Sequence, residues 1–282
     1  MIEVSRLEIL VRDKIDVLFE AQPWIKKLSN QSIAIKYGGE LLADDHNIYQ
    51  ISRDISFLYS VGIRPIIIHG FGPQLSKELK GKNIESQKIN GTRVYTKEIR
   101  DIALDVCGYI RHKLNNALMT QGVKVISPIY KDVLVQEEEG YGLVGNITSI
   151  STSSNSSILF DNNSAVLVSP FGTNRDGEIC GVNADNAVIF FAEIFSAVKL
   201  IINTSTFGVL DENHAVITHL DTIKANELIQ QGVIKDGMIP KVLNCLNSGV
   251  EKIHIIDGRI PHVLLYEIFT NKGIGTEIES KN

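Results

Sequence analysis

The chain has 282 residues, of which 44% are hydrophobic and 22% are charged, and its formal net charge is -5 at pH 7. This composition is typical of a folded globular protein that is long enough for one large domain or two lobes. A negative net charge without a clustered stripe of lysine and arginine argues against a nucleic-acid-binding domain. No run of about eighteen apolar residues is present, so the sequence predicts no membrane span.

The N-terminus and the cysteines indicate the compartment. Residues 1–6 have neither the apolar stretch of a signal peptide nor the composition of a transit peptide. The cysteines Cys107, Cys180 and Cys245 are far apart and odd in number, which suits a reducing compartment. We therefore expect the protein to work in the cytoplasm, or in a plastid stroma if its gene is organelle-encoded.

The first predicted element is a helix over residues 1–28, because apolar residues recur there at a spacing of three to four. Pro23 is expected to break this helix, since proline lacks the N–H that an interior helical residue donates. The helix precedes the first strand and has no place inside a sheet. It packs either on its own domain or against another subunit.

Strands and helices then alternate along the chain, and this alternation predicts an α/β fold with a parallel sheet wrapped by helices. An acidic turn at residues 137–140 is expected at the tip of a hairpin, and the polar run 151–157 between two lobes. The expected strands are 33–37, 65–69, 122–126, 143–147, 165–169, 198–202 and 253–256, and the expected helices are 47–61, 74–80, 97–121, 185–197, 224–231 and one that starts near 237.

Two glycine-rich turns are the most informative stretches. The first strand carries Lys36 near its end and is followed by Gly38 and Gly39, and the second strand is followed by Gly70 and Gly72. Neighbouring parallel strands end at the same edge of a sheet, where α/β folds bind their ligands. The N–H groups of such turns can bind an anion, so we expect the two turns to converge on a phosphate site.

Charged residues that could act at this site are Lys36, Arg93, Asp185 at a predicted helix start, and Lys241 beside a glycine-bearing turn. Phosphoryl transfer needs cationic groups and N–H donors around the transferred group. The motifs GxxxxGK(S/T), HRD, DFG and GxSxG are absent, which argues against a Walker-type nucleotide site, a protein kinase and a serine hydrolase. The alternative for each charged residue is structural, as a surface charge, an ion-pair partner or a helix-end charge.

Six motifs occur in a fixed order: residues 36–39 (KYGG), 69–73 (HGFGP), 91–94 (GTRV), 183–185 (NAD), 236–241 (DGMIPK) and 257–262 (DGRIPH). Together they resemble the acetylglutamate kinases of the amino-acid kinase family. The resemblance implies a three-layer αβα sandwich with an eight-stranded, mostly parallel central sheet. It also implies an N-terminal helix for oligomerisation or regulation (1–28), a lobe for the amino-acid substrate (29–160) and a lobe for ATP (161–282).

The activity that the resemblance implies is phosphorylation of the γ-carboxylate of N-acetyl-L-glutamate by ATP with Mg²⁺, in arginine biosynthesis. Lys36 and Lys241 would neutralise the moving phosphoryl group from opposite sides, and Asp185 would hold both lysines in ion pairs. The acceptor carboxylate is already ionised at pH 7, so no general base is required. No metal site made of protein residues is predicted.

The resemblance also implies the residues that bind the two substrates. Arg93 would clamp a carboxylate of the acyl amino acid in a bidentate pair, and Asn183 would lie beside this substrate. The turn made by Gly70, Phe71 and Gly72 would contact it as well. The residues implied for the phosphates and the nucleotide are Gly38, Gly39, Ser205, Gly208 and Met238.

Four positions depart from the family pattern. Phe71 replaces a glycine, Gly181 an asparagine, Ser205 an aspartate and Phe207 a proline. Phe71 can still donate its N–H only if the turn needs no positive φ there. Phe71, Gly181 and Ser205 motivate an alternative function, a catalytically weak regulatory subunit that binds arginine and a partner. A second alternative is a kinase of the same family for another substrate, such as aspartate, carbamate or a nucleoside monophosphate.

The long first helix resembles the N-terminal helix of the arginine-inhibited members of the family, in which three dimers interlace into a hexamer. We therefore expect a homo-oligomer, either a hexamer or a dimer, with arginine as a feedback inhibitor. A PII-type nitrogen-signalling protein binds some relatives. No residue pattern decides whether it binds this chain.

Overall fold

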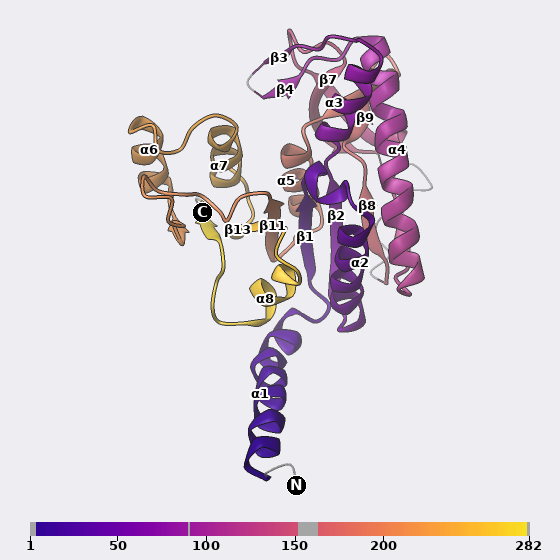
Figure 1. Cartoon of the computed structure of the whole chain (residues 1–282). Helices are drawn as coiled ribbons and strands as arrows, with labels where there is room; N and C mark the ends of the chain where they lie inside the picture. The colour runs from indigo at the N-terminus through magenta and orange to yellow at the C-terminus, as the bar shows by residue number, and fades with distance from the viewer. Residues whose placement is uncertain (1–3, 90, 152–162, 281–282) are drawn as a thin grey trace.

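The computed structural model describes residues 4–89, 91–151 and 163–280. A long helix, α1 (Val4–Leu28), projects from a body that is built on one central sheet (Figure 1). Most of the polar run expected between two lobes, residues 152–157, lies outside the described residues. In the described part of the chain, no helix is both long enough and apolar enough to cross a membrane.

The central sheet has eight strands. They are β1 (Ser32–Tyr37), β2 (Arg64–His69), β5 (Val125–Ile126), β8 (Ala165–Val168), β11 (Lys199–Thr204), β12 (His219–Leu220), β13 (Lys252–Asp257) and β14 (Thr276–Glu279). Their order is β12-β14-β13-β11-β1-β2-β8-β5, and each neighbouring pair is parallel except β13 with β14. The expected eight-stranded, mostly parallel sheet is therefore confirmed.

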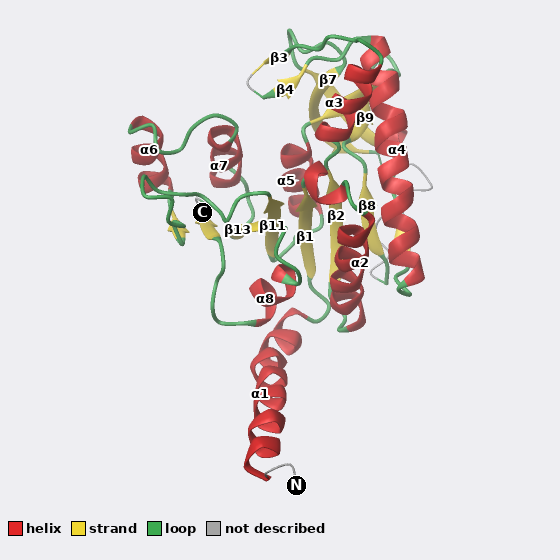
Figure 2. Ribbon diagram, in the orientation of Figure 1, coloured by secondary structure: helices red, strands yellow, loops and turns green. Residues whose placement is uncertain are grey.

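Helices flank this sheet (Figure 2). After α1 come α2 (Asp45–Ser60), α3 (Gly72–Gly81), α4 (Lys97–Thr120), α5 (Ala184–Ile194), α6 (Thr222–Gln230), α7 (Met238–Leu246) and α8 (Val263–Phe269). Helix α5 packs across β1 and β2, and α2 also packs on β2. Every residue of β2 is buried, which requires both faces of the sheet to be covered, as in parallel sheets generally.

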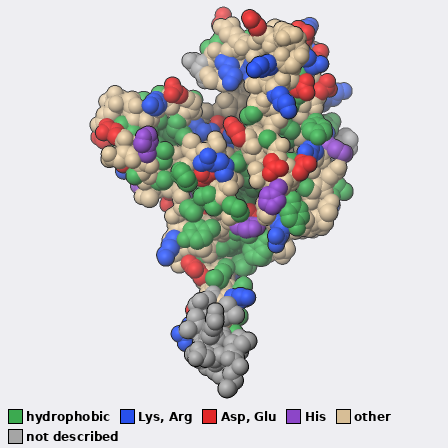
Figure 3. Space-filling model, viewed as in Figure 1, with side chains coloured by type: hydrophobic (Ala, Val, Ile, Leu, Met, Phe, Trp, Pro, Cys, Tyr) green, Lys and Arg blue, Asp and Glu red, His purple; other side chains and the backbone are tan. Residues whose placement is uncertain are grey.

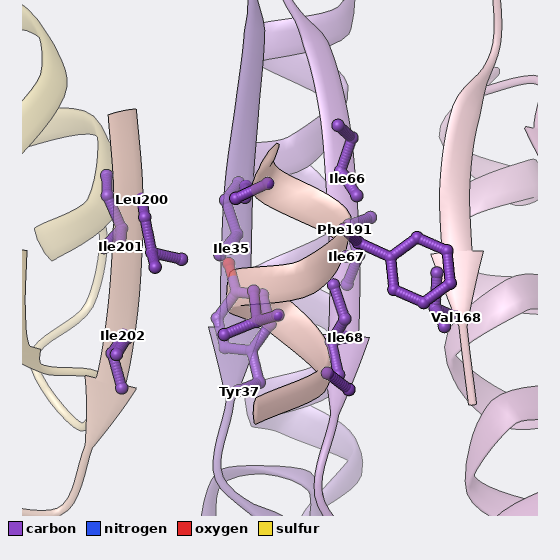
Figure 4. Close-up of a cluster of buried hydrophobic side chains, with 14 of the residues drawn as sticks. Ile35, Tyr37, Ile66, Ile67, Ile68, Val168, Phe191, Leu200, Ile201 and Ile202 are labelled. Carbon is purple, nitrogen blue, oxygen red and sulfur yellow. The ribbon is translucent and has the colours of Figure 1, made fainter. Parts of the chain in front are cut away.

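The core lies between the central strands and the helices. Each of β1, β2 and β11 contributes at least two isoleucines, of which Ile35, Ile67 and Ile201 are fully buried. These side chains fit the crowded surface of a twisted sheet better than they fit a helix. Phe191 of α5 lies against the strands from one face (Figure 4). The short apolar runs of the sequence thus form strands that are buried on both faces of the sheet, and this core fixes the positions of the strand ends.

A small closed barrel lies above the carboxyl ends of the central strands (Figure 1). Its strands are β6 (Val133–Glu137), β7 (Val144–Ile150), β9 (Phe171–Thr173) and β10 (Ile179–Val182), and a hairpin of β3 (Lys88–Ile89) and β4 (Thr92–Arg93) lies beside it. β6 and β7 pair antiparallel across the acidic turn, which confirms the expected hairpin tip. The expected strand 143–147 corresponds to β7, whereas β9, β10 and the β3–β4 hairpin have only two to four residues per strand and are too short for the periodicity of the sequence to indicate them.

Strands β8, β9 and β10 follow residue 161, but they pair with β2, β5, β6 and β7 from the first half of the chain. The chain crosses to the other half of the sheet at β11, which pairs with β1 and β13. The division into functional regions at residues 28 and 160 stays a prediction.

Helix α1 differs from its expected form, because it continues through Pro23 to Leu28. Proline removes one helical hydrogen bond, but Trp24 and Ile25, which follow it, pack against the core. This burial outweighs the local cost and keeps the last turn helical. Before Pro23 the helix exposes apolar side chains, including Val17, Leu18 and Phe19 at 63–65%.

Candidate active site

Two lysines from distant parts of the chain contact one carboxylate. Lys36 lies near the end of β1 and Lys241 lies in α7, whereas Asp185 lies in the first turn of α5. The Nζ atom of Lys36 is 3.1 Å from Oδ1 of Asp185, and Nζ of Lys241 contacts Oδ2 of the same carboxylate. We refer to Lys36, Asp185 and Lys241 as the charged triad.

The charged triad is mostly shielded from water, with side chains 12–18% exposed. Burial raises the pKa of Asp185, but the charges of Lys36 and Lys241 outweigh it and hold this pKa well below its ordinary value of 3.8. Asp185 is therefore ionised at neutral pH, and two lysines on one carboxylate leave one positive charge in surplus. A partly desolvated surplus of this kind can stabilise an anionic group that arrives beside it.

Local structure fixes the carboxylate. The side chain of Asn183 caps α5 by accepting a hydrogen bond from the N–H of Asp185 at 2.8 Å. The side chain of Asn203, at the end of β11, donates to the carbonyl of Lys36 at 3.2 Å. Asn203 thus joins the ends of β11 and β1 beside Lys36, and Asn183 fixes the start of the helix that carries Asp185.

The two glycine turns lie in contact at the edge of the sheet. A Cβ added to Gly70 would lie only 3.1 Å from the backbone N of Gly39. The N–H of Gly70 donates to Tyr37 O at 2.8 Å, and the N–H of Gly38 donates to Asn203 O at 3.3 Å. The turns thus converge, but these two N–H groups already have backbone partners. Gly38 and Gly70 thus contribute the close approach of two backbones, whereas donation to a ligand by the N–H groups of Gly39 and Gly72 stays a prediction.

Phe71 adopts a φ of -151° and directly precedes α3, so the turn needs no positive φ at this position. Its side chain is buried and stacks on Phe171 of β9, with ring centroids 5.6 Å apart and planes inclined by 18°. The phenylalanine therefore joins the turn to the small barrel without straining the backbone.

His69, which precedes the second turn, is fully buried. Its Nε2 is 4.0 Å from Sγ of Cys107, and its Nδ1 has no hydrogen-bond partner among the described residues. Burial lowers the pKa of His69 from 6.5 to about 4. The imidazole is therefore neutral at physiological pH and serves the packing under the turn.

A cavity of about 180 Å³ lies between the second turn, the β3–β4 hairpin and the barrel. Arg93 lines this cavity, and within the described residues its guanidinium contacts hydroxyls, of Ser86 and of Ser76 at 2.6 Å, and no carboxylate. A cation without an acidic partner at a cavity wall can receive a ligand carboxylate. The other lining residues predicted from the sequence are Gly70, Phe71, Gly72 and Asn183.

The residues suggested for the nucleotide lie on the other half of the sheet. Ser205 is exposed in the loop after β11, and Met238 is the first residue of α7. Gly208 has a φ of +140°, and a Cβ there would meet Oγ1 of Thr276 at 2.7 Å. None of these three residues lines the Arg93 cavity. A hollow between the part with α6 and α7 and the part with the barrel is visible in Figure 3.

Three residues at the site were not singled out from the sequence: Lys88, Tyr95 and Asn203. Lys88 pairs with Arg93 across the hairpin, and both line the cavity together with Tyr95. The position of Asn203 at the carboxyl end of a parallel strand is a signal that could have identified it. Lys88 and Tyr95 depend on a hairpin and a barrel contact that no local pattern indicates.

A comparison with protein families matches residues 31–257 to the model of the amino acid kinase family. The chain belongs to the amino-acid kinase family. A relative from Acinetobacter baumannii, called acetylglutamate kinase, is 35% identical and aligns over 95% of this chain and 95% of its own. A second acetylglutamate kinase, from Alkaliphilus metalliredigens, is 39% identical over 94% of this chain and 87% of its own. The resemblance inferred from the motifs is thus confirmed.

Solved structures share the fold. N-acetylglutamate synthase from Neisseria gonorrhoeae, in complex with coenzyme A and N-acetyl-glutamate, superposes with a TM-score of 0.84 at 22% identity. The alignment covers 95% of this chain but 64% of the synthase, so this chain corresponds to only part of that protein. At this identity the likeness shows the fold alone.

Proposed function

We propose that this protein is an ATP-dependent kinase that phosphorylates the γ-carboxylate of N-acetyl-L-glutamate, a step in arginine biosynthesis. The observation that carries the proposal is the contact of Lys36 and Lys241 with the single carboxylate of Asp185, between the Arg93 cavity and the α7 half of the sheet. The two relatives named acetylglutamate kinase, which align over most of their length, support it.

In the proposed reaction, an oxygen of the substrate carboxylate attacks the γ-phosphorus of ATP. A new O–P bond forms as the bond from this phosphorus to the β–γ bridging oxygen breaks, and ADP leaves with that electron pair. The products are N-acetylglutamyl 5-phosphate and ADP. The attacking oxygen carries no proton at pH 7, so the protein has to supply charge and orientation and needs no base.

Lys36 and Lys241 are proposed to supply that charge. The transferred group is most anionic around its equatorial oxygens, where positioned cations stabilise the transition state more than the ground state. Asp185 keeps both ammonium groups in place before the substrates arrive, which avoids the cost of ordering two long side chains during the reaction. Gly38 and Gly39 are proposed to lie beside the phosphates of the nucleotide. Their backbones closely approach Asn203 and the second turn, so a side chain at either position would collide with these neighbours.

The substrates are proposed to bind on the two sides of the charged triad. Arg93 would bind a carboxylate of acetylglutamate, with Asn183 and the turn 70–72 beside it. Ser205, Gly208 and Met238 would contact the nucleotide. Mg²⁺, when bound with ATP, would supply positive charge that offsets the charge of the phosphates. Asp185, the acidic member of the charged triad, is already engaged by two lysines, so we expect the phosphates and water to provide the ligands of this ion.

The test is a coupled ADP-release assay with the purified protein and MgATP. Acetylglutamate should be phosphorylated, whereas aspartate, carbamate and uridine monophosphate should give only background ADP release. ADP release with one of the latter instead would assign the chain to another substrate within the family. If isothermal titration detected binding of neither acetylglutamate nor a nucleotide analogue, the regulatory-subunit alternative would replace the proposal.

Arginine is proposed as a feedback inhibitor on the basis of a second cavity, of about 730 Å³, at the base of α1. Glu251 and Glu277 line it together with Trp24 of α1, beside Lys27, Lys199 and Lys252, and a carboxylate suits a guanidinium. Glu267 also lines this cavity but already pairs with His254 at 2.7 Å. Millimolar arginine should inhibit the enzyme, and Glu277→Gln should weaken the inhibition. Unchanged activity in arginine would contradict this proposal without affecting the kinase reaction.

Assembly into an oligomer is proposed from the apolar side chains that α1 exposes, such as Val17, Leu18 and Phe19. A projecting helix with exposed apolar side chains is a liability in a monomer and a contact surface in an oligomer. A hexamer is expected, and light scattering that gave a stable dimer would contradict it. Binding of a PII-type protein and the compartment, cytoplasm or plastid stroma, stay predictions.

A further inference from the structure

Two glycines, Gly142 and Gly181, lie so close to Tyr95 that neither position has room for a side chain. A Cβ built on Gly181 would lie 2.5 Å from Cε2 of the Tyr95 ring, and a Cβ built on Gly142 would meet the carbonyl oxygen of Tyr95. Real Cβ atoms do not approach other atoms so closely, so a side chain at either glycine would displace the tyrosine. Gly142 also has a φ of +65°, which other residues rarely adopt.

Backbone hydrogen bonds fix the position of Tyr95 beside these two glycines. Its N–H donates to Tyr141 O at 3.0 Å, and its carbonyl accepts from the N–H of Leu143 at 2.9 Å. Leu143 in turn accepts from the N–H of Gly181 at 2.9 Å. Tyr95 and Gly181 are therefore connected by backbone hydrogen bonds through Leu143. Tyr95 is only 9% exposed.

Tyr95 and Gly181 line the same cavity as Arg93. The cavity has a cationic part, made by Arg93 and Lys88, and an apolar part. A ligand that fits both parts has a carboxylate at one end and an apolar group at the other. The residues of the apolar part, in addition to Tyr95, are Leu75, Val144, Pro170 and Val182.

We propose that Tyr95 is a specificity-determining residue, whose ring forms the wall against which the acyl group of the substrate packs. This inference rests on the proposed function and adds to it the residue that limits the size of the acyl group. The glycine at position 181 is required because it lets the ring lie against β10, at the edge of the cavity.

The first test compares N-acetyl-L-glutamate with N-butyryl-L-glutamate in the ADP-release assay. Tyr95→Thr removes the ring and makes room for the longer chain, so the ratio of kcat/KM for the butyryl to the acetyl substrate should rise about tenfold or more. Tyr95→Phe keeps the ring and should leave this ratio within about threefold of the wild-type value. Tyr141→Thr is a matched control, because Tyr141 is equally buried but does not line the cavity.

The second test asks whether Gly181 acts through the ring. Gly181→Ala should displace the ring and raise the KM for acetylglutamate about tenfold or more, with little change in the KM for ATP. In the Tyr95→Thr background the same substitution should change KM less than about twofold, since no ring remains to be displaced. A structural effect of alanine on β10 would instead persist in both backgrounds.

The outcomes separate this inference from the proposed function. An unchanged butyryl-to-acetyl ratio in a folded Tyr95→Thr variant overturns the role of Tyr95, and so does an equal effect of Gly181→Ala in the two backgrounds. If thermal melting shows that Tyr95→Thr does not fold, an unchanged KM in Gly181→Ala overturns it. Absence of ADP release by the wild-type protein with either acyl substrate would overturn the proposed function, and the inference with it.

Discussion

The ammonium group of Lys36 lies 3.1 Å from Oδ1 of Asp185, and Lys241 contacts the other oxygen of this carboxylate. One acidic side chain therefore joins a strand from the first half of the chain to a helix from the second half. The geometry leaves a surplus of positive charge at the carboxyl edge of a parallel sheet, where ligands bind in α/β folds.

Lys241→Ala should lower kcat by about two decades or more with only a modest change in KM, because the lost charge acts mainly on the transition state. Steady-state kinetics with acetylglutamate and MgATP measure both parameters. Lys224→Ala, which removes an exposed lysine of α6, is the matched control and should leave kcat unchanged. Equal kcat values for Lys241→Ala and the wild type would remove the proposed mechanism.

Asp185→Asn should lower the free energy of unfolding by about 3 kcal/mol at pH 7, because it leaves two partly buried lysines without their counter-charge. Urea denaturation measures this change. Asp45→Asn is the control, since the carboxylate that pairs with Lys113 is 79% exposed and should contribute less than about 1 kcal/mol. If the two substitutions had the same small effect, the charged triad would not be a stabilising unit.

The stability contributed by ionised Asp185 should depend on pH in one direction. Its pKa is lower in the folded protein than the ordinary value of 3.8, so the contribution is present above about pH 4 and is lost as the pH falls through the folded-state pKa. The difference in unfolding free energy between wild type and Asp185→Asn should thus be constant from about pH 6 to 8 and shrink below about pH 4. A difference that stays constant in acid would contradict the assigned pKa direction.

Arg93→Gln should raise the KM for acetylglutamate about 10- to 100-fold, because a charge-assisted hydrogen bond to a carboxylate contributes about 1.5–3 kcal/mol. The KM for ATP should stay the same, since the nucleotide is expected on the other half of the sheet. Arg175→Gln, at an exposed turn, removes the same charge and should change neither KM. A parallel rise of both KM values would indicate that Arg93 supports the structure instead of binding the substrate.

Acid should destabilise the protein through His69. Because the pKa of His69 is lowered from 6.5 to about 4 in the folded state, the unfolded chain binds more protons between these values, and stability falls as the pH decreases through this range. The loss between pH 7.5 and pH 5 should be about 2 kcal/mol. His69→Gln should reduce this pH dependence, whereas His112→Gln, on the exposed face of α4, should keep it. Urea denaturation at the two pH values distinguishes these outcomes.

The sequence alone determined the α/β class, the parallel sheet and the order of the motifs. The buried strands are short apolar runs, and the helices show apolar residues with a period near 3.6. Local sequence patterns therefore predict both kinds of element. The convergence of the two glycine turns also followed from local sequence, because parallel neighbours end at one edge. The family resemblance added the pairing of Lys36 and Lys241 with Asp185, which spacing alone could not indicate.

Only the tertiary structure decided the rest. It showed that the N–H groups of Gly38 and Gly70 have backbone partners, that α1 continues past Pro23, and that Tyr95 lies on Gly181. Each of these features depends on atoms from segments that are far apart in the sequence. The local sequence of a turn or around a proline indicates only which backbone conformation is preferred. The packing of distant residues determines which conformation is adopted and which groups remain free to bind a substrate.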